Sequence, residues 1–140
     1  MTPHLGERFE RRTFGPLTRT DFVRYAGASG DFNPIHHDEI YAVGAGFPSV
    51  FSVGMLQAAI LGAYVTDLFG PENVRRFAVR FKEQVWPDDI LTCVAEVAEV
   101  KPDDGIVVLT LQCLRQTGGV AIQGTAEIAA SPVGPEPAVG

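Results

Sequence analysis

One short loop, from Asp31 to His36, holds the residue types best suited to proton transfer. A carboxylate and an imidazole can each accept and release a proton, and the imidazole does so close to neutral pH. Pro34 excludes a regular helix through the loop, and Asn33 directly before it favours extended backbone. The resulting bend would bring two side chains that are five positions apart toward the same point. Asp31 and His36 are therefore predicted to be an acid/base pair that acts on one water molecule.

Taken one at a time, these residues have simpler explanations. Asp and Asn are common in turns, and a single histidine usually lies on the surface or is satisfied within a core. Asn33 alone is equally well explained as a turn residue. It is the combination of Asp31 and His36 in one string that favours catalysis. Which of the two is the base stays open, because a coupled pair shares its titration.

Helices are predicted on both sides of this loop. Thr18 begins a hydroxyl-x-x-acid pattern typical of a helix start, and the helix should run to about Ala28 before Gly30 ends it. A short helix over Asp38–Val43 is expected to follow. Residues 44–52 then form a second loop that leads into the most apolar part of the chain.

A long buried helix is predicted within the apolar stretch from Val53 to Phe69, because that stretch is apolar nearly all round. Its first turn offers backbone N–H groups without intrahelical partners and the positive end of the helix dipole. Glycine lets another group approach the backbone closely, so Gly54 is the candidate donor to a substrate oxygen, an oxyanion site. Ser52 is interpreted either as the N-cap of this helix or as a pocket residue.

The second half of the chain is predicted to be an antiparallel meander, because apolar and polar residues alternate between turn sequences. Together with one short strand near the start, the predicted strands are 8–14, 77–81, 90–101, 106–116 and 120–130. A curved sheet with one apolar face can wrap the apolar helix, which makes the fold class α+β. We expect one domain over residues 1–130 and a disordered, Pro- and Gly-rich tail over 131–140.

Composition narrows the classes of function. The net charge of −6 argues against a nucleic-acid partner. Cys93 and Cys113 lie outside any C-x-x-C and in strand-like runs, so buried free thiols are predicted. Neither a metal-ligand cluster nor a Gly-rich dinucleotide loop is present in the sequence, so no metal and no bound cofactor are expected. The polar start and the lack of an apolar run of roughly 18–20 residues predict a cytoplasmic protein without a membrane span.

The segment Ser29–Asp38 resembles the MaoC-like family of (R)-specific enoyl-CoA hydratases and acyl dehydratases, and Ala42, Gly46 and the Gly54-Met55 pair fit the same pattern. The likeness covers residues 17–130. It implies a hot-dog fold, in which a curved antiparallel sheet is wrapped around a long central helix. It also implies that water is added to, or removed from, an α,β-unsaturated acyl thioester of the (R)-3-hydroxyacyl-CoA type.

The resemblance also assigns roles to residues of the loop. Asp31 and His36 would hold the same water. The resemblance does not decide which is the base; our own assignment is Asp31, with His36 orienting that water and returning the proton. Asn33 would hydrogen-bond within the loop and keep both side chains in place. His37, which the family pattern does not require, is expected to be exposed and inert. The acyl carrier, coenzyme A or a carrier protein, is part of the substrate and is not a resident cofactor.

One departure from the family pattern concerns Val53, which stands where the family usually has a histidine before the Gly-Met pair. Valine needs no hydrogen-bond partner, so the departure predicts a drier, more apolar acyl pocket. Phe47 and Phe51 are candidates to extend that wall. The departure therefore bears on the range of substrates more than on the type of reaction. The sequence predicts neither the length of the acyl chain nor whether the substrate carries a steroid or a fatty acyl group.

The densest basic group in the sequence is formed by Arg75, Arg76, Arg80 and Lys82. Charge on alternating strand positions is ordinary for a solvated sheet face. The functional interpretation places Arg80 and Lys82 against the phosphates of coenzyme A or of a carrier-protein arm. Both interpretations stay open.

Two other functions compete with a hydratase. A hot-dog thioesterase also directs a carboxylate at water, and a non-catalytic chain could serve as the structural partner of an active subunit. The Asp-x-x-Gly-His pattern of one thioesterase group is absent, because Pro34-Ile35 replaces it. The presence of both Asp31 and His36 argues against a non-catalytic partner chain. The small core predicts an assembly of at least two hot-dog units, either a homodimer or a heterodimer with another hot-dog subunit. The weaker likeness to actinobacterial members, some of which are pairs of unlike subunits, leaves that choice open.

Overall fold

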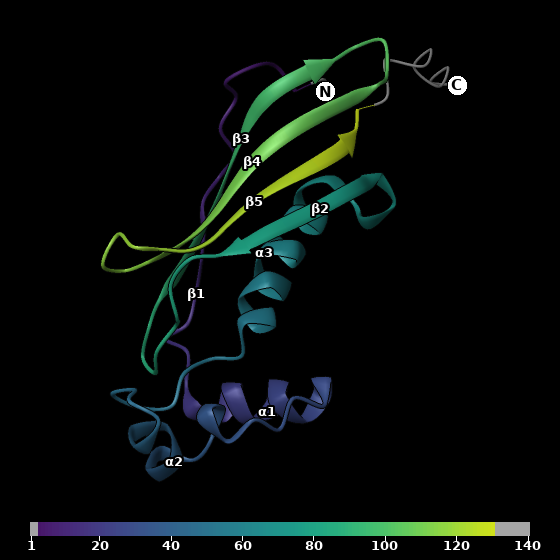
Figure 1. The fold of residues 1–140 in the computed structure, drawn as a ribbon. Coiled ribbons are helices and arrows are strands. Elements are labelled where there is room, and N and C mark those ends of the chain that lie inside the picture. Colours follow the sequence, from purple (N-terminus) through teal and green to yellow (C-terminus); the bar gives the residue numbers. More distant parts are fainter. Residues whose placement is uncertain (1–2, 131–140) are drawn as a thin grey trace.

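The computed structural model describes residues 3–130 and shows an α+β fold made of one antiparallel sheet and a long helix (Figure 1). The predicted tail, residues 131–140, lies outside the described residues. The sheet has the strand order β1-β3-β4-β5-β2. Its elements in chain order are β1 (Arg12–Phe14), α1 (Arg19–Ser29), η1 (Pro34–His36), α2 (Glu39–Gly44), α3 (Gly54–Phe69), η2 (Pro71–Asn73), β2 (Val74–Phe81), β3 (Leu91–Lys101), β4 (Ile106–Arg115) and β5 (Val120–Ala129).

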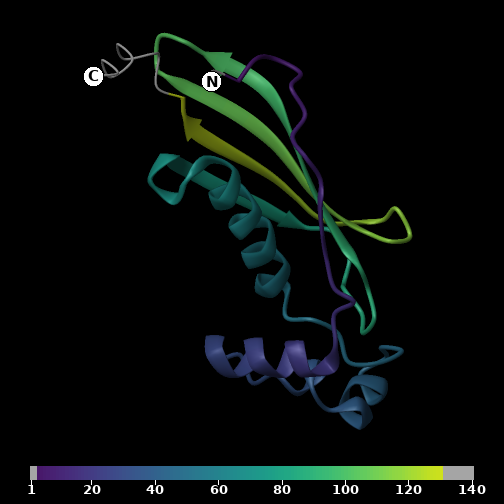
Figure 2. The same ribbon diagram turned by 180° about the vertical axis from the view of Figure 1, so that it is seen from behind.

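Helix α3 lies along one face of the sheet, and α1 and α2 lie beyond its N-terminal end (Figures 1 and 2). The alternating residues of β3, β4 and β5 point to α3 and are almost completely buried, among them Val97, Leu109 and Leu111. They form one core with Leu61 and Tyr64 of α3. Burying each such side chain contributes roughly 1.5–3 kcal/mol, so this interface is the main source of stability.

Close packing of β2, β5 and α3 depends on Gly124. A Cβ atom at this position would lie 3.0 Å from the carbonyl oxygen of Ala78 and 3.5 Å from Leu61 Cδ2. Both neighbours belong to packed elements, and the backbone oxygen cannot move aside. The sheet therefore approaches the helix at β5 because position 124 has no side chain.

The predicted elements match the observed ones closely, with two corrections. The strand predicted over residues 8–14 exists only at Arg12–Phe14, and Arg8 makes an isolated bridge to Glu96. Between them the chain leaves the regular ladder, because the carbonyl of Glu10 accepts a hydrogen bond of 2.7 Å from the Tyr64 hydroxyl of α3. The strand predicted over 77–81 begins earlier, at Val74.

Cys93 and Cys113 are free and fully buried, which confirms their prediction as core thiols. They lie directly opposite one another on β3 and β4. The hydrogen bond with Cys113 and the burial of the pair raise the pKa of the Cys93 thiol. Among residues 3–130 no helix is long and apolar enough to cross a membrane.

Candidate active site

Asp31 is placed by the end of helix α1. The helix begins with the predicted capping box at Thr18 and ends at Gly30, whose φ of 74° is left-handed. This turn lets the Asp31 N–H donate to Ala26 O at 3.0 Å and directs the carboxylate away from the helix. Asp31 Oδ1 then accepts a hydrogen bond of 3.3 Å from the Asn33 N–H. Oδ2 is the oxygen that faces His36.

Asn33 connects the two proposed catalytic residues through hydrogen bonds of the loop. Its N–H donates to Asp31, its side-chain Oδ1 accepts from the Ile35 N–H at 3.2 Å, and its carbonyl accepts from the His36 N–H at 3.1 Å. These bonds shape the 3-10 turn η1 that carries His36. Asn33 is itself exposed, so it acts within the loop and does not face a cavity.

The His36 ring is held in one orientation. Its Nδ1 lies 2.8 Å from the carbonyl oxygen of Phe51, and because a carbonyl only accepts, Nδ1 must carry the proton. The Phe51 ring packs against the imidazole at 5.2 Å between centroids. Nε2 is therefore the nitrogen that gains and loses a proton, and it lies 3.7 Å from Asp31 Oδ2.

The spacing of this pair suits a shared water. At 3.7 Å, Nε2 and Oδ2 are too far apart for a good direct hydrogen bond. Both atoms can accept, so one water molecule could donate a hydrogen to each. The His36 side chain is only 8% exposed, whereas that of Asp31 is 43% exposed, so the pair links a buried pocket to solvent.

A cavity of about 220 Å³ lies beside His36 at the start of α3. It is bounded on the α3 side by Ser52, Gly54 and Gln57. The full set of lining residues is His36, Phe51, Ser52, Gly54, Gln57, Phe81, Lys82, Glu83 and Gln84. The predicted site residues His36, Ser52 and Gly54 therefore meet at one cavity.

Gly54 begins α3, and the N-cap, Val53, makes no side-chain capping hydrogen bond. No side chain therefore caps the first backbone N–H groups; the Leu56 N–H donates to Val53 O at 2.9 Å, which leaves the Gly54 N–H available, as an oxyanion site requires. A Cβ atom on Gly54 would lie 3.0 Å from Phe81 Cε1, so that ring covers the glycine closely. The N-cap interpretation of Ser52 is wrong, because Val53 occupies that position, while the pocket interpretation agrees with the cavity lining.

Val53 itself does not border this cavity. Its side chain is buried, at 3% exposure, and it is absent from the cavity's lining among the described residues. The apolar part of the wall comes from Phe51 and Phe81 instead. Phe47, the other aromatic residue predicted for the wall, packs behind Phe51 at 4.7 Å between ring centroids. The predicted effect of Val53 on substrate choice would therefore have to act through the position of Ser52 and Gly54.

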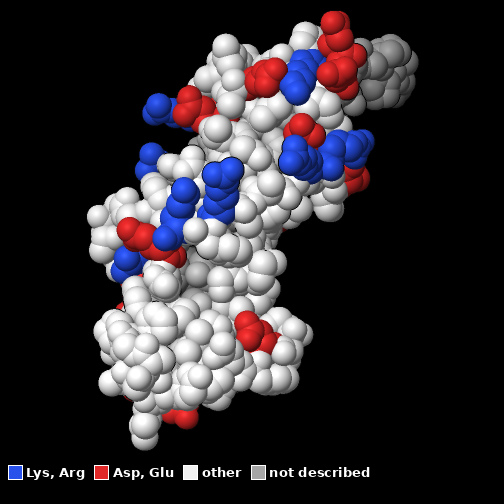
Figure 3. Space-filling model, in the orientation of Figure 1, with Lys and Arg blue, Asp and Glu red and all other residues white. Residues whose placement is uncertain are grey.

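The basic residues lie on and beside β2. Arg76, Arg80 and Lys82 line a hollow of about 460 Å³ on the sheet, and Lys82 also lines the cavity beside His36. Figure 3 shows Lys and Arg side chains gathered over the sheet, whereas the part of this face formed by α1 and α2 carries hardly any. Arg75 instead donates to the carbonyl of Glu72 and takes no part in the hollow.

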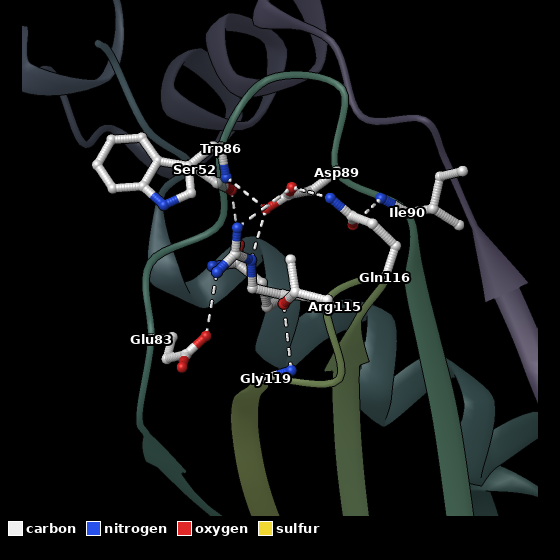
Figure 4. Close-up of polar contacts among 10 residues, drawn as sticks. Ser52, Glu83, Trp86, Asp89, Ile90, Arg115, Gln116 and Gly119 are labelled. Carbon is white, nitrogen blue, oxygen red and sulfur yellow. Dashed lines mark hydrogen bonds and ion pairs between the residues drawn. The ribbon is translucent and has the colours of Figure 1, made fainter. Parts of the chain in front are cut away.

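A polar network fixes the segment between β2 and β3, which forms one side of the cavity (Figure 4). Asp89 is 3% exposed and accepts hydrogen bonds from Arg115 Nε at 2.8 Å, Gln116 Nε2 at 2.7 Å and the Trp86 N–H at 2.9 Å. Burial alone would raise the pKa of Asp89, but these bonds outweigh it and hold the pKa below its ordinary value. Val85 in this segment accepts a bond of 2.8 Å from the Ser52 N–H, so the network also positions the entry to α3.

Four lining residues were not predicted from the sequence: Gln57, Phe81, Glu83 and Gln84. Gln57 interrupts an apolar helix three positions after Gly54, and that polar residue on the same helix face was an available signal. Phe81 ends a strand and gives no such signal, because its place over Gly54 depends on the packing of β2 against α3. His37 is exposed, as expected. Among residues 3–130 no group of three or more His, Cys, Asp or Glu could hold a metal ion.

Comparison with known proteins agrees with this geometry. The (R)-specific enoyl-CoA hydratase of Aeromonas caviae is 31% identical over 110 residues, which cover 77% of this chain and 82% of that protein. The 3-hydroxyacyl-thioester dehydratase X of Mycobacterium tuberculosis is 42% identical over 69 residues, but these are only 49% of this chain and 24% of that protein. The unliganded R-hydratase PhaJ1 of Pseudomonas aeruginosa superposes with a TM-score of 0.80 at 29% identity, over 91% of this chain and 81% of that one.

The sheet and helix of these hydratases are those of the hot-dog fold, which confirms the predicted architecture. Residues 1–114 match the family described as the MaoC like domain. This range includes the loop with Asp31 and His36, the glycine at the start of α3, and most of the sheet. The chain belongs to the MaoC-like domain family.

Proposed function

We propose that the protein adds water to, or removes it from, an α,β-unsaturated acyl thioester of the (R)-3-hydroxyacyl type. Relatives named hydratase and dehydratase catalyse the two directions of one reversible lyase reaction. The observation that carries the proposal is the pair Asp31 Oδ2 and His36 Nε2, 3.7 Å apart, with the far side of the ring fixed on Phe51 O. Two acceptors at this spacing can hold one water at the edge of the cavity.

The proposed reaction uses both groups of the pair. Asp31 accepts a proton from the water as its oxygen bonds to the β-carbon, and the electrons of the double bond move to the thioester oxygen. Neutral His36 orients the water through Nε2. The proton taken up by Asp31 then passes to Nε2, which delivers it to the α-carbon as the thioester carbonyl re-forms. Water has then been added across the double bond and both residues are restored. Proton transfer by a positioned group accounts for about 10²- to 10⁴-fold in rate.

The thioester oxygen gains charge during this reaction and needs a donor. We place it against the uncapped N–H of Gly54, where the dipole of α3 also favours negative charge. The substrate's pantetheine arm would leave the cavity past Lys82, which lines both the cavity and the basic hollow. The phosphates would then lie near Lys82 and Arg80, as coenzyme A or a carrier-protein arm requires.

The test is a spectroscopic assay with short and long trans-2-enoyl-CoA substrates, in which loss of enoyl absorbance reports hydration. Asp31→Asn and His36→Ala should each lower kcat/KM at least about 10²-fold with the unfolding transition unchanged. His37→Ala is the matched control, because that neighbouring histidine is exposed, and it should retain full activity. Activity above about a third of wild type in either variant of the pair would contradict the mechanism. Release of free thiol without loss of enoyl absorbance would identify a thioesterase instead.

We further propose an assembly of at least two hot-dog units. Strand β2 is an edge of the sheet, and its last residue, Phe81, is 55% exposed beside the active-site cavity. An unpaired edge strand with an exposed aromatic residue is normally covered. Light scattering at micromolar concentration should show at least a dimer, and a clean monomer would refute the proposal. A homodimer with full activity would argue against an unlike partner subunit.

A further inference from the structure

Gln57 is a buried polar residue in the largely apolar helix α3. Within residues 3–130 the buried polar or charged side chains are His36, Ser52, Gln57 and Asp89. Asp89 is occupied by its network, and His36 belongs to the catalytic pair. Ser52 and Gln57 remain, both 2% exposed and both lining the cavity beside His36. A buried amide in an apolar helix is costly unless its donors and acceptors are used.

Ser52 determines the orientation of the Gln57 amide. The Ser52 hydroxyl lies 2.6 Å from Gln57 Oε1 and 3.2 Å from the Val53 carbonyl oxygen. A hydroxyl has one hydrogen to donate, and the shorter contact receives it. Gln57 Oε1 is thus an acceptor bound to Ser52, and the amide nitrogen, Nε2, points the other way.

Gln57 Nε2 is a hydrogen-bond donor that faces the cavity. It makes no hydrogen bond to another described residue, while no enclosed side-chain nitrogen or oxygen of the described residues lacks a partner. Nε2 must therefore have some accessible surface, and the space next to it is the cavity beside His36. Its two hydrogens are available to water or to a ligand with an acceptor oxygen.

Helix geometry brings this donor beside Gly54. Residues three apart lie on the same face of a helix, and side chains lean toward the helix N-terminus. The amide of Gln57 therefore extends over the first turn of α3, where the Gly54 N–H is uncapped. The wall of the cavity then presents two donors together, one from the backbone and one from a side chain.

We propose that Gln57 Nε2 donates a second hydrogen bond to the thioester oxygen of the substrate, and that Ser52 is the positioning residue that aims this amide. The proposal rests on the function proposed above and names one more substrate-contacting group. An enolate oxygen has room for two donors, and each would strengthen as charge develops on it. Gln57 would thus contribute to turnover more than to binding.

The first experiment measures kcat and KM of Gln57 variants with an enoyl-CoA substrate. Gln57→Leu, which keeps the size and removes the donor, should lower kcat by roughly 10²- to 10³-fold with a smaller change in KM. Gln57→Glu places an acceptor in the same space and should be at least as damaging. Ser52→Ala frees the amide and should lower kcat less. Gln112→Leu is the matched control, because Gln112 lies on β4 and does not line this cavity, and it should stay close to wild type.

The second experiment separates contact with the carbonyl from a structural role. Binding is measured by calorimetry for butyryl-CoA, which has the thioester oxygen but no double bond, and for S-butyl-CoA, which lacks that oxygen. The ratio of the affinity for butyryl-CoA to the affinity for S-butyl-CoA should be roughly three- to tenfold higher in the wild type than in Gln57→Leu. Both proteins should bind S-butyl-CoA with equal affinity. A merely structural role would weaken both ligands alike.

The outcomes distinguish the two proposals. If the wild type hydrates enoyl-CoA but Gln57→Leu keeps the full preference for butyryl-CoA, or Gln57→Glu keeps wild-type kcat, the role of Gln57 is refuted and the hydratase function stands. If the wild type hydrates no enoyl thioester, both proposals fall. Should Gln57→Leu not fold, Gln57→Ala, which also removes the donor and is a strong helix former, takes its place in both measurements.

Discussion

The sheet with α3 and the segment that carries α1, η1 and α2 are stabilised in different ways. In the sheet, side chains such as Leu109 and Leu111 are completely buried against α3. In the helical segment, large apolar side chains remain exposed, with Phe32 at 70% and Ile40 at 87%. Few residues of α1 and α2 are buried at all. The first region is a closed core, and the second depends on a small number of defined attachments.

The proposed site lies across these two regions. Asp31 and His36 belong to the helical segment, while Gly54 and Gln57 begin α3. The regions are joined by specific backbone bonds, among them Leu17 N–H to Asp89 O at 2.9 Å and Ser52 N–H to Val85 O at 2.8 Å. The relative placement of the site residues therefore depends more on the segment 82–90, which provides both attachments, than on the packing of the sheet against α3.

The largest loss of stability is expected from a substitution of Asp89, in the segment 82–90 that joins the two regions. Asp89→Ala removes a buried carboxylate and leaves the Arg115 guanidinium without its main partner. Removing one member of a buried ion pair costs about 3–5 kcal/mol, so the free energy of unfolding should fall by about 3 kcal/mol in denaturant titrations. Arg115 also bonds the exposed Glu83, which should keep the loss at the lower end. A loss below about 1 kcal/mol would show that the network does not hold this segment.

Asp89 should also make stability depend on pH in the acid range. Its pKa is lowered from the ordinary value of 3.8 in the folded protein, so the unfolded chain binds a proton more readily. The stabilisation is therefore fully present above the unfolded pKa and is lost as the pH falls below 3.8 and through the folded pKa. Melting temperatures measured across this range should fall more steeply in the wild type than in Asp89→Asn, which cannot titrate there. Parallel curves would contradict this assignment.

The contrast between the regions also explains how far the sequence could predict the structure. The strands and α3 repeat one pattern over many residues, so their bounds were predicted within a residue or two, apart from the start of β2 and the short β1. The loop with Asp31 and His36 was predicted because Pro34 and its neighbours restrict the backbone locally. The closeness of Asp31 and His36 followed from the same short segment.

Contacts between distant segments were harder to predict. Phe81 reaches Gly54 only because β2 packs beside α3, and no local pattern encodes that contact. Similarly, Val53 was predicted to make the acyl pocket more apolar because it replaces the histidine usual in the family, yet its side chain is buried and does not line the cavity. Sequence thus predicted which residues come together at the proposed site better than which residues shape the space around it.

A smaller effect is expected at Asp88, in the turn of the same attachment segment. Its φ of 72° is left-handed, and it is the non-glycine residue with positive φ among those described. Such a conformation costs L-residues roughly 1–2 kcal/mol, less for Asp, so Asp88→Gly should stabilise the protein by about 0.5–1 kcal/mol after the entropy of glycine is subtracted. Thermal unfolding should show a rise of a few degrees. Asp88→Ala is the control and should show no gain, since its Cβ meets the same backbone restriction.

The smallest change in the free energy of unfolding is expected on the exposed face of α2. Ile40 is 87% exposed, so Ile40→Ser removes almost no buried area, and the free energy of unfolding should change by less than about 0.5 kcal/mol. Leu109→Ala, the matched change in the sheet, removes a fully buried side chain and should cost about 2–5 kcal/mol. Denaturant titrations of both variants at several protein concentrations make the comparison. A loss at Ile40 that grows with protein concentration would show that a second subunit covers α2, because only stability shared with a partner depends on concentration. A large loss independent of concentration would contradict the division into a closed core and a loosely packed helical segment.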